Sequence, residues 1–291
     1  MKLAIGTAQF GMDYGLSNKL GKSKKYEVSK ILKFAHSQGV DLIDTAPSYG
    51  DSENILGNLI HKYDFRIVTK TPKFDGNFID NFHSVQLYET FCESLINLGE
   101  KASYGLLVHS CDDLLKPGGE LLYKKMQDLK SIGMVEKIGV SVYSSLQINS
   151  VLDKFKIDII QLPINIFDQQ LFVDGSLEKL KNKNIEIHAR SVFLQGLLLM
   201  DPLEIPQYFL PIQDKIKMFS NTAKSLSLSK LELALNYVNE ISEIDKIVVG
   251  VNKFSQFNEL VNAKKIKINP IDFIKNSINN PQYTHPMLWK I

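Results

Sequence analysis

Four ionisable side chains of this 291-residue chain stand at or just after the ends of short apolar runs. Asp44 lies within LIDTA, Tyr49 follows it by five residues, and Lys70 and His109 end RIVTK and YGLLVH. A phenol with a pKa near 10 is a poor acid–base catalyst at neutral pH unless its phenolate is stabilised. A lysine ammonium beside it would lower that pKa, a carboxylate would hold the lysine charged, and a histidine could polarise a substrate oxygen. The set fits proton transfer to a carbonyl oxygen, with hydride supplied by a cofactor because no side chain carries it.

Each of these residues has a non-catalytic explanation when it is taken alone. Asp44 could cap a helix that begins near Asp51, since Asp is common just before helices. Lys70 could be a solvated loop lysine, His109 a strand-end histidine with satisfied hydrogen bonds, and the Tyr49 ring could simply pack in a turn. The catalytic interpretation therefore depends on whether the fold brings the four side chains together.

Short, continuously apolar runs alternate with helical patterns eight times along the chain. The runs are 3–6, 42–46, 66–70, 104–109, 137–142, 159–164, 185–190 and 246–251. Runs without polar alternation are typical of strands buried on both faces, as in a parallel sheet. Between them, 26–39 and 87–99 carry apolar residues at helical spacing and end at glycines, which commonly stop helices. The alternation predicts a (β/α)8 barrel, in which the carboxyl ends of neighbouring strands meet.

A doubly wound open sheet is the alternative architecture. Such a fold usually carries G-x-G-x-x-G after its first strand, and GTAQFG at 6–11 does not match this motif. No linker divides the chain, so we expect one domain over 1–291. We interpret 201–211 as a long connection after the seventh strand and 266–291 as a C-terminal extension.

Composition excludes several other classes of protein. The formal charge is +2, from 34 basic and 32 acidic residues, which argues against a nucleic-acid partner. Two cysteines are too few for a disulfide framework and suit a reducing compartment. No signal-peptide core opens the chain, and no apolar run is long enough for a membrane span. We expect a cytoplasmic protein, without a metal site because the six histidines show no ligand spacing; the sequence does not give the oligomeric state.

Several segments together resemble the aldo-keto reductase family over nearly the whole chain. They are GTAQFG (6–11), LIDTAPSYGDSENILG (42–57), IVTK (67–70), LLVH (106–109), EKIGVSVYS (136–144), IIQLPINIFD (159–168), ARSVFLQGLL (189–198) and VVGVNKFSQFNELV (248–261). The resemblance implies a catalytic tetrad of Asp44, Tyr49, Lys70 and His109. It also implies a nicotinamide cofactor, which we expect to be NADP, with NAD as the alternative.

The resemblance implies a cofactor site as well. Its residues would be Gly6, Thr7, Asp44, Ser141, Gln161, Arg190, Ser191, Phe193, Gln195, Gly250, Asn252, Lys253 and Gln256. Four positions depart from the family pattern, one of them Leu260, which replaces a common asparagine. Val142 stands in place of a common asparagine, and Gln256 in place of the arginine of the adenosine-phosphate loop. Arg190 replaces an aromatic residue that stacks on the nicotinamide, and its guanidinium could stack there or grip an anionic substrate.

The expected function is therefore reduction of an aldehyde, ketone or keto-sugar by NAD(P)H. The alternatives are a regulatory subunit that binds cofactor without turnover and a cofactor-free barrel lyase or isomerase. The Pro-x-x-Trp-Lys ending at 286–290 resembles reductases of bacterial sugar and surface-polysaccharide pathways, which favours a keto-sugar, free or nucleotide-linked. Trp289 in this ending is interpreted as an anchor for the tail rather than as a pocket lid.

Overall fold

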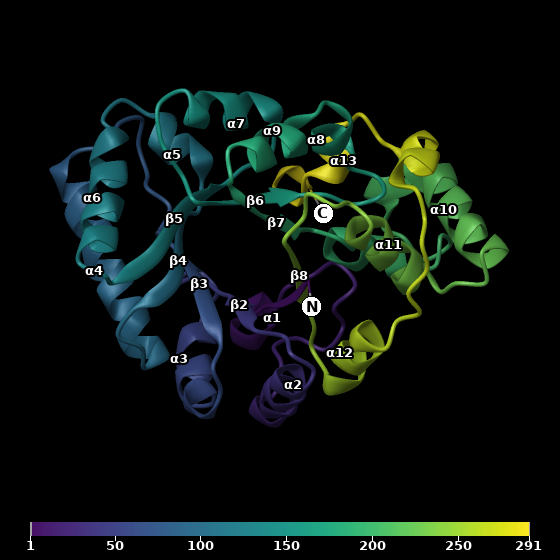
Figure 1. Ribbon diagram of the computed structural model, residues 1–291. Helices are drawn as coiled ribbons and strands as arrows, with labels where there is room; N and C mark the ends of the chain where they lie inside the picture. The colour runs from purple at the N-terminus through teal and green to yellow at the C-terminus, as the bar shows by residue number, and fades with distance from the viewer. Residues whose placement is uncertain (1, 291) are drawn as a thin grey trace.

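Eight parallel strands close into a barrel in the order β1-β2-β3-β4-β5-β6-β7-β8, with helices around the outside (Figure 1). The computed structural model describes residues 2–290, so Met1 and Ile291, the ends of the expected domain, lie outside the described residues. The strands are β1 (Leu3–Gly6), β2 (Leu42–Asp44), β3 (Arg66–Lys70), β4 (Ser103–Val108), β5 (Val135–Ser141), β6 (Ile159–Pro163), β7 (Glu186–Arg190) and β8 (Lys246–Gly250). The predicted (β/α)8 barrel is confirmed, and each predicted apolar run forms a strand.

Helices cover the outer face of the strands and bury their apolar sides against it. The α-helices are α1 (Ala8–Gly11), α2 (Lys25–Ser37), α3 (Ser52–Gly57), α4 (Asn81–Leu98), α5 (Cys111–Leu115), α6 (Glu120–Ser131), α7 (Ser145–Leu152), α8 (Gln170–Val173), α9 (Ser176–Asn182), α10 (Gln213–Ser225), α11 (Lys230–Asn239), α12 (Phe254–Val261) and α13 (Pro281–Thr284). The 3-10 helices are η1 (Ile60–Lys62), η2 (Leu194–Leu199), η3 (Gln207–Ile212), η4 (Pro270–Asn276) and η5 (Pro286–Leu288). None of the helices within residues 2–290 is long and apolar enough to cross a membrane.

The fourth helix begins earlier than its apolar pattern indicates. We predicted a helix over 87–99, but α4 begins at Asn81 because Asp80 accepts a hydrogen bond from the backbone N–H of His83 at 3.2 Å. This side-chain cap satisfies a free donor of the first turn. The helix ends as predicted before Gly99, whose φ of 69° is left-handed and suits glycine.

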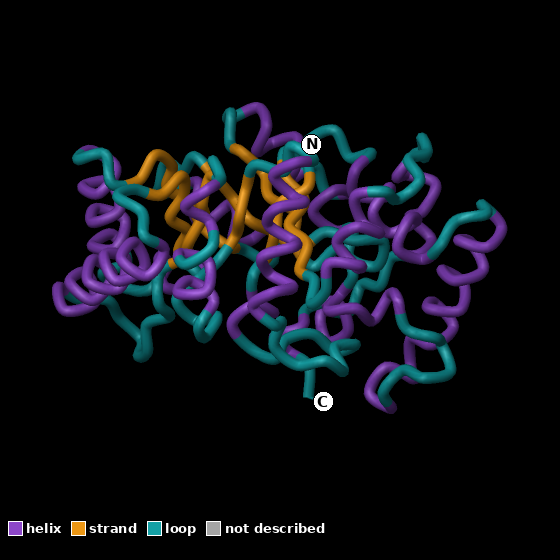
Figure 2. The backbone as a smooth tube through the Cα atoms, turned by 90° about the horizontal axis from the view of Figure 1, so that it is seen from below, coloured by secondary structure: helices purple, strands orange, loops and turns teal. Residues whose placement is uncertain are grey.

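The connection from β7 to β8 holds more regular structure than expected. The stretch 201–211, predicted as a plain connection, runs into η3, and α10 and α11 follow before β8. After α12 the chain forms η4, α13 and η5. Figure 2 shows the two termini at opposite ends of the barrel, so this tail finishes near the carboxyl ends of the strands.

Aromatic contacts hold the tail in place. The Trp289 and Phe209 rings lie 4.9 Å apart edge to face, and the indole N–H of Trp289 donates to the Tyr283 carbonyl at 3.3 Å. The Tyr208 hydroxyl donates to the Gln282 carbonyl at 2.9 Å. These contacts support the interpretation of Trp289 as an anchor.

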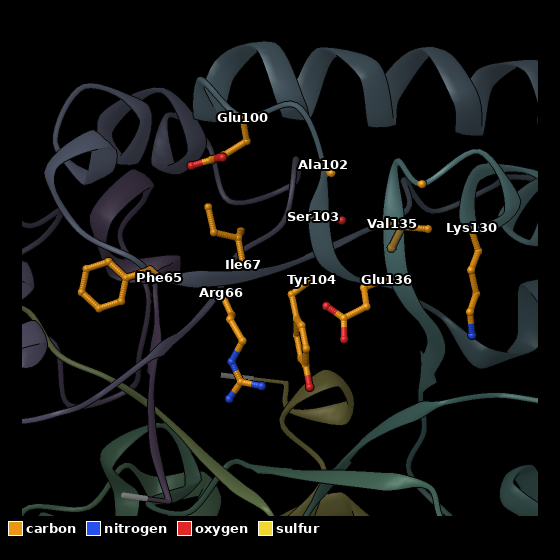
Figure 3. Close-up of a pocket in the computed structure, with 11 residues that line it drawn as sticks. Phe65, Arg66, Ile67, Glu100, Ala102, Ser103, Tyr104, Lys130, Val135 and Glu136 are labelled. Carbon is orange, nitrogen blue, oxygen red and sulfur yellow. The ribbon is translucent and has the colours of Figure 1, made fainter.

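Paired charges lie at the other end of the barrel, where the strands begin. Glu186 accepts hydrogen bonds from the Tyr104 hydroxyl and the Lys137 ammonium, and its second oxygen lies 2.7 Å from His188 Nε2. A hollow of about 600 Å³ lies beside it, lined by residues such as Arg66 and Tyr104 (Figure 3). Because this is the amino end of the strands, its polar groups serve the closure of the barrel and not the site at the other end.

Candidate active site

A buried ion pair forms the floor of the site. The ammonium of Lys70, at the end of β3, lies 2.7 Å from Asp44 Oδ1 at the end of β2 and donates to the Thr45 carbonyl at 2.8 Å. The second carboxylate oxygen of Asp44 accepts from the Gln161 side chain at 2.7 Å. Both oxygens are therefore satisfied, as a buried charge requires. Asp44 is thus not a helix cap, and Lys70, 1% exposed, is not a solvated lysine.

The loop that carries Tyr49 is fixed by close backbone packing. A Cβ on Gly11 would lie 1.8 Å from the Tyr49 carbonyl oxygen, so only glycine fits at this contact. Ser52, at the start of α3, donates to the Thr7 hydroxyl at 2.8 Å. Thr7 in turn donates to the Asp44 carbonyl at 3.0 Å, which ties the loops after β1 and β2 together.

Tyr49 lies over the ion pair. The Lys70 ammonium is 5.0 Å from the centre of the Tyr49 ring. Burial raises the pKa of the Tyr49 hydroxyl, and the nearby Lys70 only partly offsets this effect. Burial alone would lower the pKa of Lys70, but Asp44 and Tyr49 together outweigh it and the pKa is raised. Lys70 thus lowers the pKa of the phenol, as expected, but burial outweighs this effect and the net pKa is raised.

His109 follows β4 and faces the phenol. The two rings meet edge to face with centres 6.1 Å apart. The backbone N–H of His109 donates to the Thr71 hydroxyl at 3.2 Å, and Nδ1 lies 3.4 Å from Ser48 Oγ. Burial, with Lys70 next in effect, lowers the pKa of His109 to about 3, so the imidazole is neutral at neutral pH. A neutral ring can donate a hydrogen bond to a substrate oxygen without carrying a charge.

One cavity of about 830 Å³ contains the four residues and extends to the start of α12. Its lining includes all the residues predicted to contact cofactor except Lys253: Gly6, Thr7, Asp44, Ser141, Gln161, Arg190, Ser191, Phe193, Gln195, Gly250, Asn252 and Gln256. Lys253 is exposed and stands outside this lining. The barrel therefore brings together residues that are up to about 250 positions apart in the chain.

Two of the predicted cofactor residues already have partners within the chain. The amide group of Gln161 is bonded to Asp44, so this residue also orients the carboxylate. The side-chain oxygen of Gln256 accepts the backbone N–H groups of Asn252 at 2.8 Å and Lys253 at 3.1 Å. That oxygen therefore fixes the loop that leads into α12.

The loop after β1 forms a part of the cavity that was not predicted from the sequence. Tyr14, Ser17 and Asn18 line the cavity. The backbone N–H of Ser17 donates to the Gln195 carbonyl at 3.3 Å, so this loop meets the loop after β7. Loops have no apolar periodicity, and the only available signal was that loops at strand ends build barrel sites.

The loop after β7 is strained where it reaches the cavity. Ser191, Leu194 and Gln195 have φ values of 59°, 46° and 52°, in the left-handed region that side chains rarely adopt. Such conformations persist only when the surroundings fix them, and they cluster at functional sites.

The described residues form no group of histidine, cysteine or acidic side chains that could hold a metal ion.

Comparisons with known proteins agree with this geometry. An aldo-keto reductase of Gibberella moniliformis is 28% identical over 219 residues, or 72% of this chain and 65% of that protein. The aldo-keto reductase YhdN of Bacillus subtilis is 30% identical over 186 residues, or 61% of this chain and 55% of that protein. The matches thus span less than two thirds of the length of these two relatives. A solved aldo-keto reductase from Bacillus halodurans shares the fold, with a TM-score of 0.74 at 18% identity and coverage of 94% of this chain and 91% of that chain.

The family comparison covers nearly all of the barrel. The model of the aldo/keto reductase family, a family of NAD(P)H-dependent oxidoreductases, matches residues 2–275. This range includes every strand and all four residues of the tetrad. The chain therefore belongs to the aldo/keto reductase family.

Proposed function

We propose that this protein reduces a carbonyl group to an alcohol with NAD(P)H, and that Asp44, Tyr49, Lys70 and His109 carry out the proton chemistry. The observation that carries the proposal is the buried Lys70–Asp44 pair beneath Tyr49, with a neutral His109 facing the phenol. The bound cofactor supplies hydride.

Tyr49 is the proton donor in this proposal. Its raised pKa keeps the hydroxyl protonated at neutral pH, which suits a general acid. As the proton leaves, the phenolate gains the full attraction of the buried Lys70 ammonium, which Asp44 keeps charged and in place. His109, as the neutral donor, polarises the carbonyl oxygen and orients it toward the Tyr49 hydroxyl.

The long cavity fits a dinucleotide. It runs from the tetrad to the start of α12, and a helix N-terminus suits a phosphate. The N–H groups of Asn252, Lys253 and Phe254 are already bonded to Gln256 and Glu27, so a phosphate there would meet the next N–H groups of the first turn. Gly250 lines the cavity without a side chain, and a Cβ there would lie 2.3 Å from Gln9 Oε1, so a larger residue would displace the Gln9 side chain. Gly6, Thr7, Ser141 and Gln161 would lie along the nicotinamide end, in line with the family pattern.

The choice between NADPH and NADH depends on the groups around α12. Lys253 is the nearby cation for a 2′-phosphate, but it is exposed and outside the cavity lining, whereas Glu259 lines the cavity. A carboxylate repels a phosphate and accepts hydrogen bonds from a ribose hydroxyl. We propose that both cofactors bind: the family resemblance gives NADP as the expectation, whereas Glu259 in the lining and the exposed Lys253 favour NAD. Titration of protein fluorescence with NADPH and NADH separately gives the ratio of the two dissociation constants.

The substrate in this proposal is a small carbonyl compound, and a keto-sugar, free or nucleotide-linked, is the leading candidate within that class.

The free thiols of Cys92 and Cys111 agree with the proposed cytoplasmic location.

The test is the Tyr49→Phe variant assayed on a panel of aldehydes, ketones and keto-sugars. Loss of proton donation should lower kcat by about 10²- to 10⁴-fold, while the dissociation constant of NADPH stays within about twofold of the wild-type value. Unchanged reduction by the variant would refute the role of Tyr49. Cofactor binding by the wild-type protein without turnover would favour a regulatory subunit, and absence of cofactor binding would favour a lyase or isomerase.

A further inference from the structure

The cavity concentrates positive charge although the chain as a whole is nearly neutral. Five cationic side chains line it against two carboxylates: Lys19, Lys70, Lys73, Arg190 and Lys230 against Asp44 and Glu259. The whole chain has 34 basic and 32 acidic residues. A cleft lined by one sign of charge raises the local concentration of ligands of the opposite sign. The phosphates of a dinucleotide account for part of this excess, so the position of each cation matters.

Two of these cations approach the tetrad from opposite sides of the barrel mouth. Lys73 follows β3 and Arg190 ends β7, and these strands are four places apart in the closed ring of eight. Both act electrostatically on His109, together with Lys70, and each of them lowers its pKa. Because His109, Lys73 and Arg190 line the same cavity, a carbonyl substrate placed at His109 would share that cavity with both cations.

Among the residues that the structure describes, Arg190 is held in place by hydrogen bonds and by an aromatic ring, and not by a salt bridge. Its guanidinium donates to the Val142 carbonyl at 3.2 Å and the Ser191 hydroxyl at 3.3 Å, and it lies 4.2 Å from the centre of the Tyr143 ring. Within residues 2–290 no carboxylate forms an ion pair with it. A guanidinium has five N–H donors, so donors remain for a ligand.

Lys73 is presented by a loop with a fixed backbone. The next residue, Phe74, donates its N–H to Asp113 Oδ2 at 3.3 Å and accepts from the Lys116 ammonium at 2.6 Å. Asp113 and Lys116 are also paired with each other at 2.7 Å. The described part of the chain offers Lys73 itself no hydrogen bond or salt bridge, although its side chain lines the cavity.

We propose that the substrate of this site bears an anionic group, a phosphate or a carboxylate, in addition to its carbonyl, and that Arg190 and Lys73 bind that group. The planar fork of Arg190 can hold two oxygens of one oxyanion, and Lys73 acts as a second, more mobile charge. The proposal rests on the proposed carbonyl reduction. It narrows the substrate class to carbonyl compounds that also carry a phosphate or a carboxylate.

Matched pairs of substrates test this proposal. Glyceraldehyde 3-phosphate is compared with glyceraldehyde, and succinic semialdehyde with butanal, as kcat/KM at low and high ionic strength. A charge-assisted hydrogen bond should favour the anionic member of at least one pair by about 10- to 100-fold, and the preference should shrink in high salt. The pair that shows the larger preference distinguishes a phosphate from a carboxylate.

Variants then assign the preference to the two cations. Arg190→Met and Lys73→Met should each lower the ratio of anionic to neutral kcat/KM by about tenfold, and Arg190→Lys should restore part of the loss. Lys101→Met is the matched control, because Lys101 is exposed and lies outside the cavity lining. If Arg190→Met changes the cofactor dissociation constant and leaves the ratio intact, Arg190 belongs to the cofactor and its assignment here is wrong.

The outcomes separate this inference from the proposed function. If neutral carbonyls are reduced as efficiently as anionic ones, the anionic substrate is refuted and carbonyl reduction stands. If no carbonyl is reduced, titration calorimetry tests whether the cavity binds anions. It compares the binding of glycerol 3-phosphate with that of glycerol, and the binding of succinate with that of butanol. Binding of an anion that Arg190→Met and Lys73→Met weaken supports the anion site, and absence of binding overturns it.

Discussion

Asp168, in the loop after β6, is expected to make the stability of this barrel fall as the pH rises. Asp168 is 8% exposed, and among residues 2–290 its Oδ2 has no hydrogen-bond partner; His285 Nε2 lies 3.9 Å away. Burial raises the pKa of Asp168 to about 7, although Arg190 and the Gln170 N–H favour the ionised form. Burial also lowers the pKa of His285, so this imidazole does not supply a compensating charge near neutral pH.

The direction and size of the effect follow from the two pKa values of Asp168. The ordinary value is 3.8, so between about pH 4 and pH 7 the folded chain holds a proton that the unfolded chain has released. Stability therefore declines across this range and the loss is complete above pH 7. The shift corresponds to at most about 4 kcal/mol. Asn at this position keeps an oxygen for the Gln170 N–H, carries no charge, and offers an N–H to His285.

Asp168→Asn should therefore be more stable than the wild type at pH 8, and the difference should vanish near pH 4. Thermal unfolding followed by far-UV circular dichroism measures this, since about 1 kcal/mol moves the Tm of a domain this large by about 2–4 °C. Asp113→Asn is the matched control, because Asp113 is equally buried but paired with Lys116, so its replacement should destabilise the protein at pH 8. A variant no more stable than the wild type at pH 8, or a gain that persists at pH 4, would refute the reasoning.

Three further predictions concern the site and the tail. Lys70→Met leaves the buried carboxylate of Asp44 without its charge partner and should destabilise the fold by about 3–5 kcal/mol, measured by thermal unfolding at pH 7.5; an unchanged Tm would contradict the buried pair. The pH profile of kcat/KM between pH 5 and pH 8 should show no step from His109, whose pKa is lowered to about 3; a step that disappears in His109→Gln would argue against this. Trp289→Ala removes the edge-to-face contact with Phe209 and should speed proteolytic cleavage of the tail while Tm changes little; an unchanged cleavage rate would show that other contacts anchor the tail.

The fold and the tetrad could be predicted from the sequence because their signals are local. An apolar run such as 66–70, rich in β-branched residues, favours a buried strand, and its polar last residue, Lys70, marks the carboxyl end. Once eight such runs imply a closed barrel, the ends of β2, β3 and β4 must be neighbours. The meeting of Asp44, Lys70 and His109 therefore follows from topology alone.

Other features depend on contacts that no local pattern encodes. The start of α4 is set by the side chain of Asp80, and the six residues that follow it lack a clear apolar stripe. The cavity wall formed by Tyr14 and Ser17 arises because the loop after β1 reaches the loop after β7. The raised pKa of Tyr49 results from burial, a tertiary property that outweighs the neighbouring Lys70.

Burial acts in opposite ways on the members of the tetrad. It keeps the hydroxyl of Tyr49 protonated because it outweighs the neighbouring Lys70 ammonium. It keeps the ring of His109 uncharged because the charged groups that act on this ring are cations as well. Lys70 stays charged in the same surroundings because Asp44 lies 2.7 Å away and is itself held by Gln161. The site thus presents two neutral donors above one fixed charge pair. A carbonyl oxygen that gains negative charge would meet donors already oriented toward it and a cation already desolvated, so little reorganisation is needed during the reaction.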